Sequence, residues 1–186
     1  MNRGLDRACM RTAAWAGIGA LIIGAAARVT LPLPGADLPQ SAQTLAVLLV
    51  GAWMGASRGL TSVTLYILAG ALGLPVFADG ASGLQTALGP SGGYLLGFAC
   101  AAGIVGRLAD AEALARPWWR TLGAMLGAHA VILALGWAWL ALLALGPSQA
   151  WSAGVAPFLV GGAAKSVLAA AAVWGVARMR SAPPPR

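Results

Sequence analysis

A glycine-rich polar stretch interrupts an otherwise lipid-like chain. It reads GLPVFADGASGLQTALGPSGG over residues 73–93, between a hydrophobic run that ends at Leu72 and another that begins at Tyr94. Irregular backbone leaves N–H and C=O groups unpaired, so a membrane protein keeps it outside the bilayer or around a protein-enclosed cavity. The stretch therefore predicts a long outer loop, and it is the first place to expect a ligand.

The composition supports a membrane protein. Hydrophobic residues make up 59% of the chain and charged residues 9%, whereas a typical soluble domain has about 25% charged residues. The 26 glycines and 8 tryptophans fit closely packed helices with aromatic rings near the lipid headgroups. We predict an all-α, polytopic membrane protein whose residues 1–186 form a single integral membrane domain.

Six hydrophobic runs are candidates for membrane-spanning helices, because about 20 apolar residues cross the hydrocarbon core. The two short runs are interpreted as a hairpin turned by Ser57-Arg58-Gly59. The runs cover residues 12–27, 42–56, 60–72, 94–108, 122–145 and 153–177. The sequence thus predicts one bundle of six transmembrane helices with long outer loops at 28–41, 73–93 and 146–156.

Basic residues predict the orientation, since cytoplasmic loops near helix ends accumulate lysine and arginine. Ten of the twelve basic residues fall on one side of the predicted bundle: Arg3, Arg7, Arg11, Arg58, Arg107, Arg116, Arg120, Arg178, Arg180 and Arg186. Both termini are therefore expected to be cytoplasmic, in a multi-pass protein of the cell membrane. The net charge of +7 reflects this topology and contact with anionic lipid, and no nucleic-acid partner is expected.

The first hydrophobic run has two interpretations. Basic residues followed by an apolar stretch that ends in Gly24-Ala25-Ala26-Ala27 are typical of a cleavable signal peptide. We favour a retained first helix, because its removal would leave five spans and break the charge asymmetry. Its small residues at four-residue spacings suit close packing on another helix, either within the bundle or on a partner.

Three sequence segments resemble a known transporter family. They are Gln43-Thr44-Leu45-Ala46-Val47-Leu48-Leu49, Gly73-Leu74-Pro75-Val76-Phe77 and Gly89-Pro90-Ser91-Gly92-Gly93-Tyr94-Leu95. From about residue 28 to 165 the chain resembles the BioY family, the biotin-specific substrate-binding components of energy-coupling factor transporters. The resemblance implies a biotin ligand, a transmembrane scaffold subunit and ATPase subunits as partners, and a proline-rich loop at 28–41 that covers the bound vitamin.

Catalytic chemistry is not expected. The chain has one histidine and no Gly-x-x-x-x-Gly-Lys-Ser/Thr loop for nucleotide phosphates, so it should not hydrolyse ATP itself. The two cysteines form no ligand or disulfide pattern, and we predict no metal and no cofactor. His129 is interpreted as a hydrogen-bonded packing residue, with a proton-relay role as the alternative.

Lys165 is the most informative single residue. If the last helix starts near Ser152, Lys165 stands about 20 Å along its axis, near the middle of the bilayer. A bare ammonium there costs several kcal/mol, so the side chain should face the bundle interior and meet a polar partner. Snorkelling to the interface is the alternative. We expect the partner to be the ligand.

The family resemblance also implies a site in which this chain departs from the usual pattern. Related chains carry the motif Pro-Phe-Leu-Pro-Gly-Asp, and two residues separate its aspartate from the lysine that follows. Both the aspartate and the lysine belong to the biotin pocket. This chain has Gly162 at the aspartate position, so other polar groups must replace it or the ligand differs. The predicted substrate-binding residues are Lys165, Tyr94, Gly93, Asp79, Gln43, Thr44, Ser91 and Gly162, with Gln85 as a further candidate.

The predicted function is uptake of biotin, bound from outside in an occluded pocket. One alternative is a related cofactor such as lipoate or a biotin precursor, which the glycine at position 162 would favour. A solitary facilitator is another alternative, and a membrane scaffold without transport activity is a third. A membrane scaffold without transport activity would have no need for an intramembrane lysine.

Overall fold

The protein is an almost entirely helical bundle in a computed structural model that describes residues 3–31, 40–114 and 117–181. Five long helices form it: α1 (Arg3–Ala26), α2 (Gln43–Ala71), α4 (Gly92–Asp110), α5 (Trp118–Leu140) and α7 (Leu159–Ser181). The shorter elements are β1 (Thr30–Leu31), β2 (Gln40–Ser41), η1 (Ala78–Gly80), α3 (Leu84–Leu88), η2 (Ala141–Leu145), α6 (Gly146–Gly154) and η3 (Ala156–Phe158). The described residues confirm the predicted all-α fold, apart from the antiparallel ladder of β1 with β2.

The helix α2 is a hairpin of two arms. Gly55 has φ 79° and ψ 176°, a conformation that glycine adopts without the steric penalty of a Cβ. A Cβ on Gly59 would lie 3.1 Å from the Cα of Gly51, and Gln43 bonds to Tyr66, so the second arm runs back along the first. The predicted hairpin is confirmed, but its predicted turn at residues 57–59 is wrong because the chain reverses at Gly55.

Several described helices can cross a membrane. Four helical stretches are long and apolar enough, namely 43–71, 92–110, 118–143 and 146–179, and the apolar part of α1 (Met10–Ala26) is shorter. Because α2 doubles back, the described chain makes six helical passes with α1 included. The protein is a multi-pass membrane protein.

The predicted outer loops contain more structure than expected. Residues 146–154 form α6 and residues 84–88 form α3, so the predicted loop at 146–156 is largely helical. The last helix does not start near Ser152, because η3 separates α6 from α7. Lys165 therefore lies six residues, or about 9 Å, from the start of α7. Residues 32–39 of the proline-rich loop lie outside the described residues.

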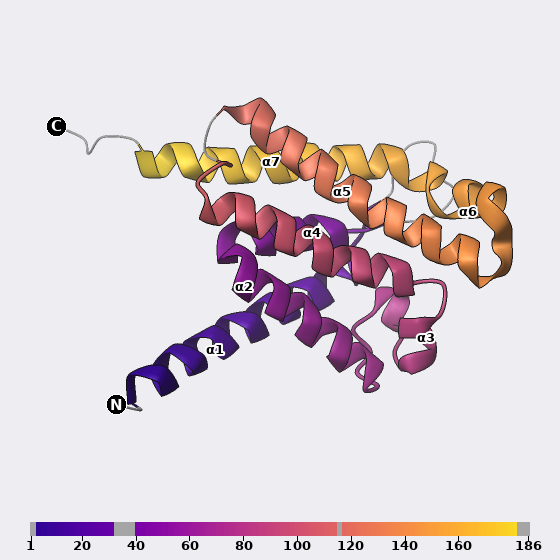
Figure 1. Cartoon of the computed structure of the whole chain (residues 1–186), viewed down its shortest axis with the longest axis horizontal. Helices are drawn as coiled ribbons and strands as arrows, with labels where there is room; N and C mark the ends of the chain where they lie inside the picture. The colour runs from indigo at the N-terminus through magenta and orange to yellow at the C-terminus, as the bar shows by residue number, and fades with distance from the viewer. Residues whose placement is uncertain (1–2, 32–39, 115–116, 182–186) are drawn as a thin grey trace.

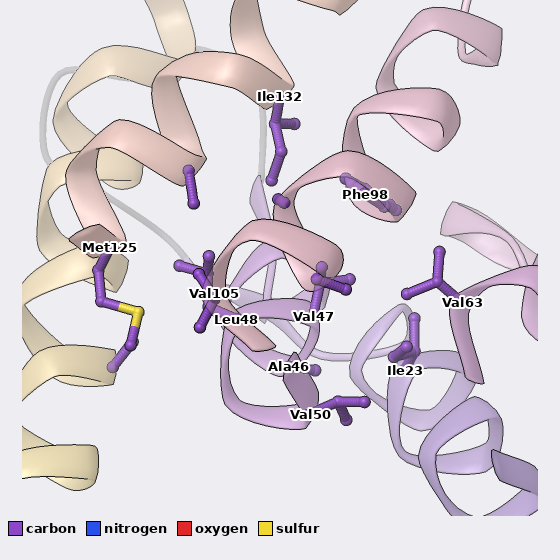
Figure 2. Packing of buried hydrophobic residues seen from close by; sticks show 14 of the residues in the cluster. Ile23, Ala46, Val47, Leu48, Val50, Val63, Phe98, Val105, Met125 and Ile132 are labelled. Atoms are coloured by element: carbon purple, nitrogen blue, oxygen red, sulfur yellow. The ribbon is translucent and has the colours of Figure 1, made fainter. Parts of the chain in front are cut away.

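The apolar core joins α1, α2, α4 and α5, and α7 adds Ala169, Ala170 and Val173 to it. Figure 2 shows Ile23, Val47, Val63, Phe98 and Ile132 converging from these helices. Glycines allow the close approach that apolar side chains alone would prevent, since a Cβ on Gly97 would lie 2.7 Å from the Cα of Ile132. The first helix belongs to this bundle, because a Cβ on Gly19 would meet the hydroxyl of Ser62 on α2.

The bundle has two distinct ends. The loop end holds α3, α6 and the starts of α4 and α7, whereas the hairpin end holds the start of α1 and the end of α7 (Figure 1). Contacts place β2 beside the start of α7, and the turn at Gly55 beside Asp110 at the end of α4. Contacts tie the loop end together: the guanidinium of Arg28 donates to the carbonyl oxygen of Pro75. The indole of Trp139 donates to the carbonyl of Gly89 at 2.9 Å. The candidate site lies toward this end.

Candidate functional site

Lys165 is buried in the bundle, on the second turn of α7. Its side chain is 4% exposed, and its Nζ donates to the backbone carbonyl of Ser41 on β2 at 3.0 Å. Within residues 3–31, 40–114 and 117–181, no carboxylate forms an ion pair with this ammonium. A buried cation without a counter-ion is costly, which makes the surroundings of Lys165 the candidate binding site.

A chain of hydrogen bonds leads from Lys165 into α2. The hydroxyl of Ser41 donates to Oε1 of Gln43 at 3.0 Å, and Nε2 of Gln43 donates to the hydroxyl of Tyr66 at 2.5 Å. Gln43 is 5% exposed and Tyr66 is 1% exposed. The structure thus brings two predicted site residues, Lys165 and Gln43, to the same part of the bundle.

Gln40 is a site residue that the sequence reasoning missed. It is 1% exposed, and its Nε2 donates to the carbonyl of Pro157 at 2.5 Å, which joins β2 to η3, just ahead of α7. A glutamine directly after Pro39 and just before the second span was the available signal. Its role could not be recognised because Pro157 lies 117 residues away.

Three buried polar atoms on β2, α2 and α5 make no hydrogen bond with the described residues. They are Oε1 of Gln40, Oγ1 of Thr44 and Nδ1 of His129. Leaving a buried donor or acceptor unpaired costs about 1–3 kcal/mol each. Gln40 precedes Ser41, whose carbonyl bonds Lys165, and His129 lies against Gly162 on the same helix as Lys165. Unpaired groups of this kind can be satisfied by a polar ligand.

Gly162 lies against His129. A Cβ at Gly162 would lie 2.7 Å from Nε2 of His129 and 2.8 Å from its Cδ2, so the missing side chain is what admits the imidazole ring. His129 is 4% exposed. The interpretation of His129 as a hydrogen-bonded packing residue is therefore incomplete, because its Nδ1 is unpaired.

Gly93 and Tyr94 hold helices together in this structure. A Cβ on Gly93 would clash with the Cβ of Trp139 on α5, and one on Gly136 would clash with the ring of Tyr94. The hydroxyl of Tyr94 donates to the carbonyl of Gly154 at 2.5 Å. Both residues have a packing explanation, and their role in binding stays a prediction.

The remaining predicted residues lie in the loop of residues 72–91. Asp79, Gln85 and Ser91 are exposed, and none of them bonds to Lys165, whose Nζ donates to Ser41. Asp79 has a left-handed backbone with φ 54°, which Asp tolerates better than most residues. The structure places these three residues at the rim of the loop end, so a binding role would require the loop to fold over a ligand.

An apolar groove lies elsewhere on the bundle. It has a volume of about 170 Å³ and runs between α1 and the first arm of α2, with Ile22, Leu45, Leu49, Trp53 and Met54 in its lining. The lining contains no ionisable side chain, so nothing in the groove could orient a charged ligand. We therefore place the candidate site at Lys165 and not in this groove.

The chemistry of the Lys165 site suits binding rather than reaction. It offers one ammonium, the amides of two glutamines, two hydroxyls and one imidazole, all within a helical bundle. Such a set can hold a small molecule that carries a negative charge and several hydrogen-bonding groups.

The comparison with protein families agrees with this arrangement. The model of the BioY family matches residues 1–182. The chain belongs to the BioY family. Its match begins ahead of the first predicted span and continues past Lys165, so the whole bundle is covered.

Members of the BioY family from archaea and bacteria are similar to this chain. A probable biotin transporter BioY of Pyrococcus horikoshii is 37% identical over 123 residues, which cover 66% of this chain and 70% of the relative. A biotin transporter BioY of Rhodobacter capsulatus is 35% identical over 175 residues, or 87% and 90% of the two chains.

A solved structure shares the fold. The crystal structure of the S-component for biotin from an ECF-type ABC transporter matches with a TM-score of 0.76 and 21% identity, over 98% of this chain and 96% of that one. At this identity the likeness establishes the fold of this BioY family member. It does not assign individual side chains to a ligand.

Proposed function

We propose that this protein is the membrane component that binds biotin for uptake into the cell. The observation that carries the proposal is the buried ammonium of Lys165, which has no carboxylate partner among the described residues, in a chain of the BioY family. Biotin carries a carboxylate and a ureido ring, and both can use the polar groups that surround this lysine.

The proposed pose follows from the charges. The carboxylate of biotin pairs with Lys165, where it replaces the single neutral contact to the carbonyl of Ser41. A charge-assisted hydrogen bond is roughly twice as strong as a neutral one. The ureido group has two N–H donors and one carbonyl, which suit the unpaired Oε1 of Gln40 and Oγ1 of Thr44. Asp79 and Ser91 would then close the site from the rim, and Gly93 and Tyr94 would line its wall at the start of α4.

The proposed partners are a transmembrane scaffold subunit and ATPase subunits of an energy-coupling factor transporter. The chain has no sequence motif for nucleotide phosphates, so inward release of a tightly held vitamin needs energy from other subunits. Trp15, Ile18 and Leu21 on α1 are exposed apolar side chains. They offer a surface on which a membrane partner could pack.

The proposed location is the cell membrane with the hairpin end in the cytoplasm. Arg58 follows the turn at Gly55, Arg107 lies in the last turn of α4 and Arg120 in the first turn of α5, so described basic residues gather at this end. Lysine and arginine favour the cytoplasmic side. The loop end then faces outward, where the vitamin arrives.

A related ligand is the second candidate. Gly162 brings no acceptor for the ureido N–H groups to the turn of α7 that precedes Lys165. Lipoate or a biotin precursor with a carboxylate but without a complete ureido ring would lose less at such a site. A solitary facilitator would use the same pocket without ATPase subunits.

Titration calorimetry tests the proposal directly. The purified protein in detergent is titrated with biotin, a biotin precursor and lipoate, and we expect biotin to bind at least tenfold more tightly than lipoate. Tighter binding of lipoate would favour the second candidate, and no binding of any of the three would refute the proposal. Co-purification with ATPase subunits distinguishes a transporter component from a solitary facilitator.

Cysteine labelling in intact cells tests the orientation. Cysteines introduced at Ser82 or Ser148 should react with a membrane-impermeant maleimide, while one at Ser57 should react only after permeabilisation. A background with Cys9→Ser and Cys100→Ser removes both native thiols. Labelling at Ser57 in unbroken cells would reverse the orientation and place the pocket on the wrong side.

A further inference from the structure

His129 is a buried polar residue that packing alone does not explain. It lies on α5 with 4% exposure, and its Nδ1 makes no hydrogen bond with the described residues. Burial of an unpaired polar nitrogen disfavours the folded state. An aliphatic residue at this position would fill the same space without that cost.

The ring of His129 occupies the space beside Gly162. The Cβ that Gly162 lacks would be 2.7 Å from Nε2, so any other residue at position 162 would displace the imidazole. Gly162 and Lys165 are three residues apart and share one face of α7. The imidazole therefore lies one helical turn from the lysine, on the facing helix.

Ser166, which also lies between α5 and α7, differs from His129 in its hydrogen bonding. Ser166 is fully buried, and its hydroxyl is 2.8 Å from the carbonyl oxygen of Gly162 and 3.4 Å from that of Met125. The helices α5 and α7 thus give the hydroxyl proton of Ser166 a carbonyl acceptor. The same two helices leave Nδ1 of His129 unpaired.

We propose that His129 is a ligand-recognition residue that donates a hydrogen bond to the carboxylate held by Lys165. This inference rests on the proposed function, because it uses the same site and the same anion. An imidazole nitrogen is a donor in the tautomer that carries its proton, and a carboxylate oxygen accepts up to two hydrogen bonds. Lys165 supplies the charge, while His129, positioned by Gly162, fixes the orientation of the second oxygen.

The test compares two ligands in matched variants. Biotin and biotin methyl ester are titrated into the original protein, His129→Phe, His129→Asn and Ser166→Ala. The ester keeps the ureido ring and the side chain but has no negative charge. Melting curves of the empty proteins in detergent establish that each variant is folded.

We expect His129→Phe to weaken biotin binding at least tenfold, about 1.4 kcal/mol, and to weaken the ester less than threefold. His129→Asn, which keeps a polar group near the position of Nδ1, should recover part of the loss. Ser166→Ala should change neither affinity more than twofold. Equal losses for biotin and the ester would mean that the ring serves packing, and the inference would then be wrong.

A second pair of variants tests the same geometry without removing the ring. Gly162→Ala should weaken biotin binding in the original protein because the methyl group displaces the imidazole, and should have no further effect in a His129→Ala background. Additive losses would overturn the inference. If the original protein binds biotin and His129→Phe binds it equally well, the inference alone fails. If the original protein does not bind biotin, the proposed function itself fails.

Discussion

The two ends of the bundle differ in how completely their polar groups are paired. At the hairpin end, Oδ2 of Asp110 accepts a hydrogen bond from the backbone N–H of Ala56 at 3.0 Å, and the hydroxyl of Thr121 donates to the carbonyl of Leu114. Toward the loop end, Gln40, Thr44 and His129 each leave one buried atom unpaired. Polar groups that the fold satisfies stabilise it, whereas groups that it leaves unpaired are available to a ligand.

Glycines show the same difference. A Cβ on Gly106, at the hairpin end, would lie 2.5 Å from both the Cα and the N of Ala56. These are backbone atoms that cannot move without moving a helix. A Cβ on Gly162 would meet the outer atoms of the His129 ring, which a side-chain rotation can displace. One glycine is therefore required by helix packing, and the other by the position of a single side chain.

The largest expected effect follows from this contrast. Gly106→Ala should destabilise the folded protein by about 1–3 kcal/mol through overpacking, which is more than the roughly 1 kcal/mol that alanine gains over glycine in a helix. Thermal melting in detergent measures the loss. Gly103→Ala on the same helix, where a Cβ meets nothing within 4 Å, is the matched control and should be neutral or stabilising. An undiminished melting temperature for Gly106→Ala would show that the hairpin turn is not tightly packed on α4.

Lys165→Ala should weaken biotin binding without lowering the stability of the empty protein. We expect biotin affinity to fall at least tenfold, or about 1.4 kcal/mol, while the empty protein melts no earlier, because the variant removes a buried cation without a carboxylate partner. Calorimetry and melting curves on the same preparation give both numbers. Lys165→Arg keeps the charge and serves as the comparison. Unchanged affinity in Lys165→Ala would mean that the lysine serves packing. The loop end would then hold no polar group shown to bind the ligand.

Asp110→Ala should have the smallest effect. Unlike Lys165→Ala, it should lower stability without changing affinity. The carboxylate receives the N–H of Ala56 at the first residue after the turn, in the manner of a helix N-cap, and loss of such a cap costs about 0.5–2 kcal/mol. Stability should fall by that amount, with no change in biotin affinity. Asp110→Asn retains an acceptor oxygen and should lose less. A fall in affinity would mean that the hairpin turn is coupled to the distant site.

Much of the fold could be predicted from the sequence because hydrophobicity acts locally. The membrane class, the helix count, the hairpin between the two short runs and the burial of Lys165 follow from apolar length and from the cost of a charge in lipid. The exact turn could not be predicted. Ser57-Arg58-Gly59 has the polar composition of a turn, but Gly55 is the residue that adopts positive φ, beside the acceptor Asp110 on another helix.

The candidate site was predicted less completely, since glycine-rich polar sequence does not distinguish a ligand loop from a packing surface. Gly93 and Tyr94 were chosen from such a stretch, and the structure gives them partners in α5 and α6. Gln40 was missed because its partner, the carbonyl of Pro157, lies 117 residues along the chain.

The sequence by itself determined that this protein is a bundle of apolar helices with one lysine buried among them, because the energies of burying apolar and charged groups add up along the chain. Only the tertiary structure decided which polar groups surround that lysine. His129 lies against Gly162, and Gln40 bonds across to Pro157, because helix packing brings residues from distant parts of the chain together. Which buried atoms remain unpaired, and are thus available to a ligand, depends on every contact that the helices make when they pack.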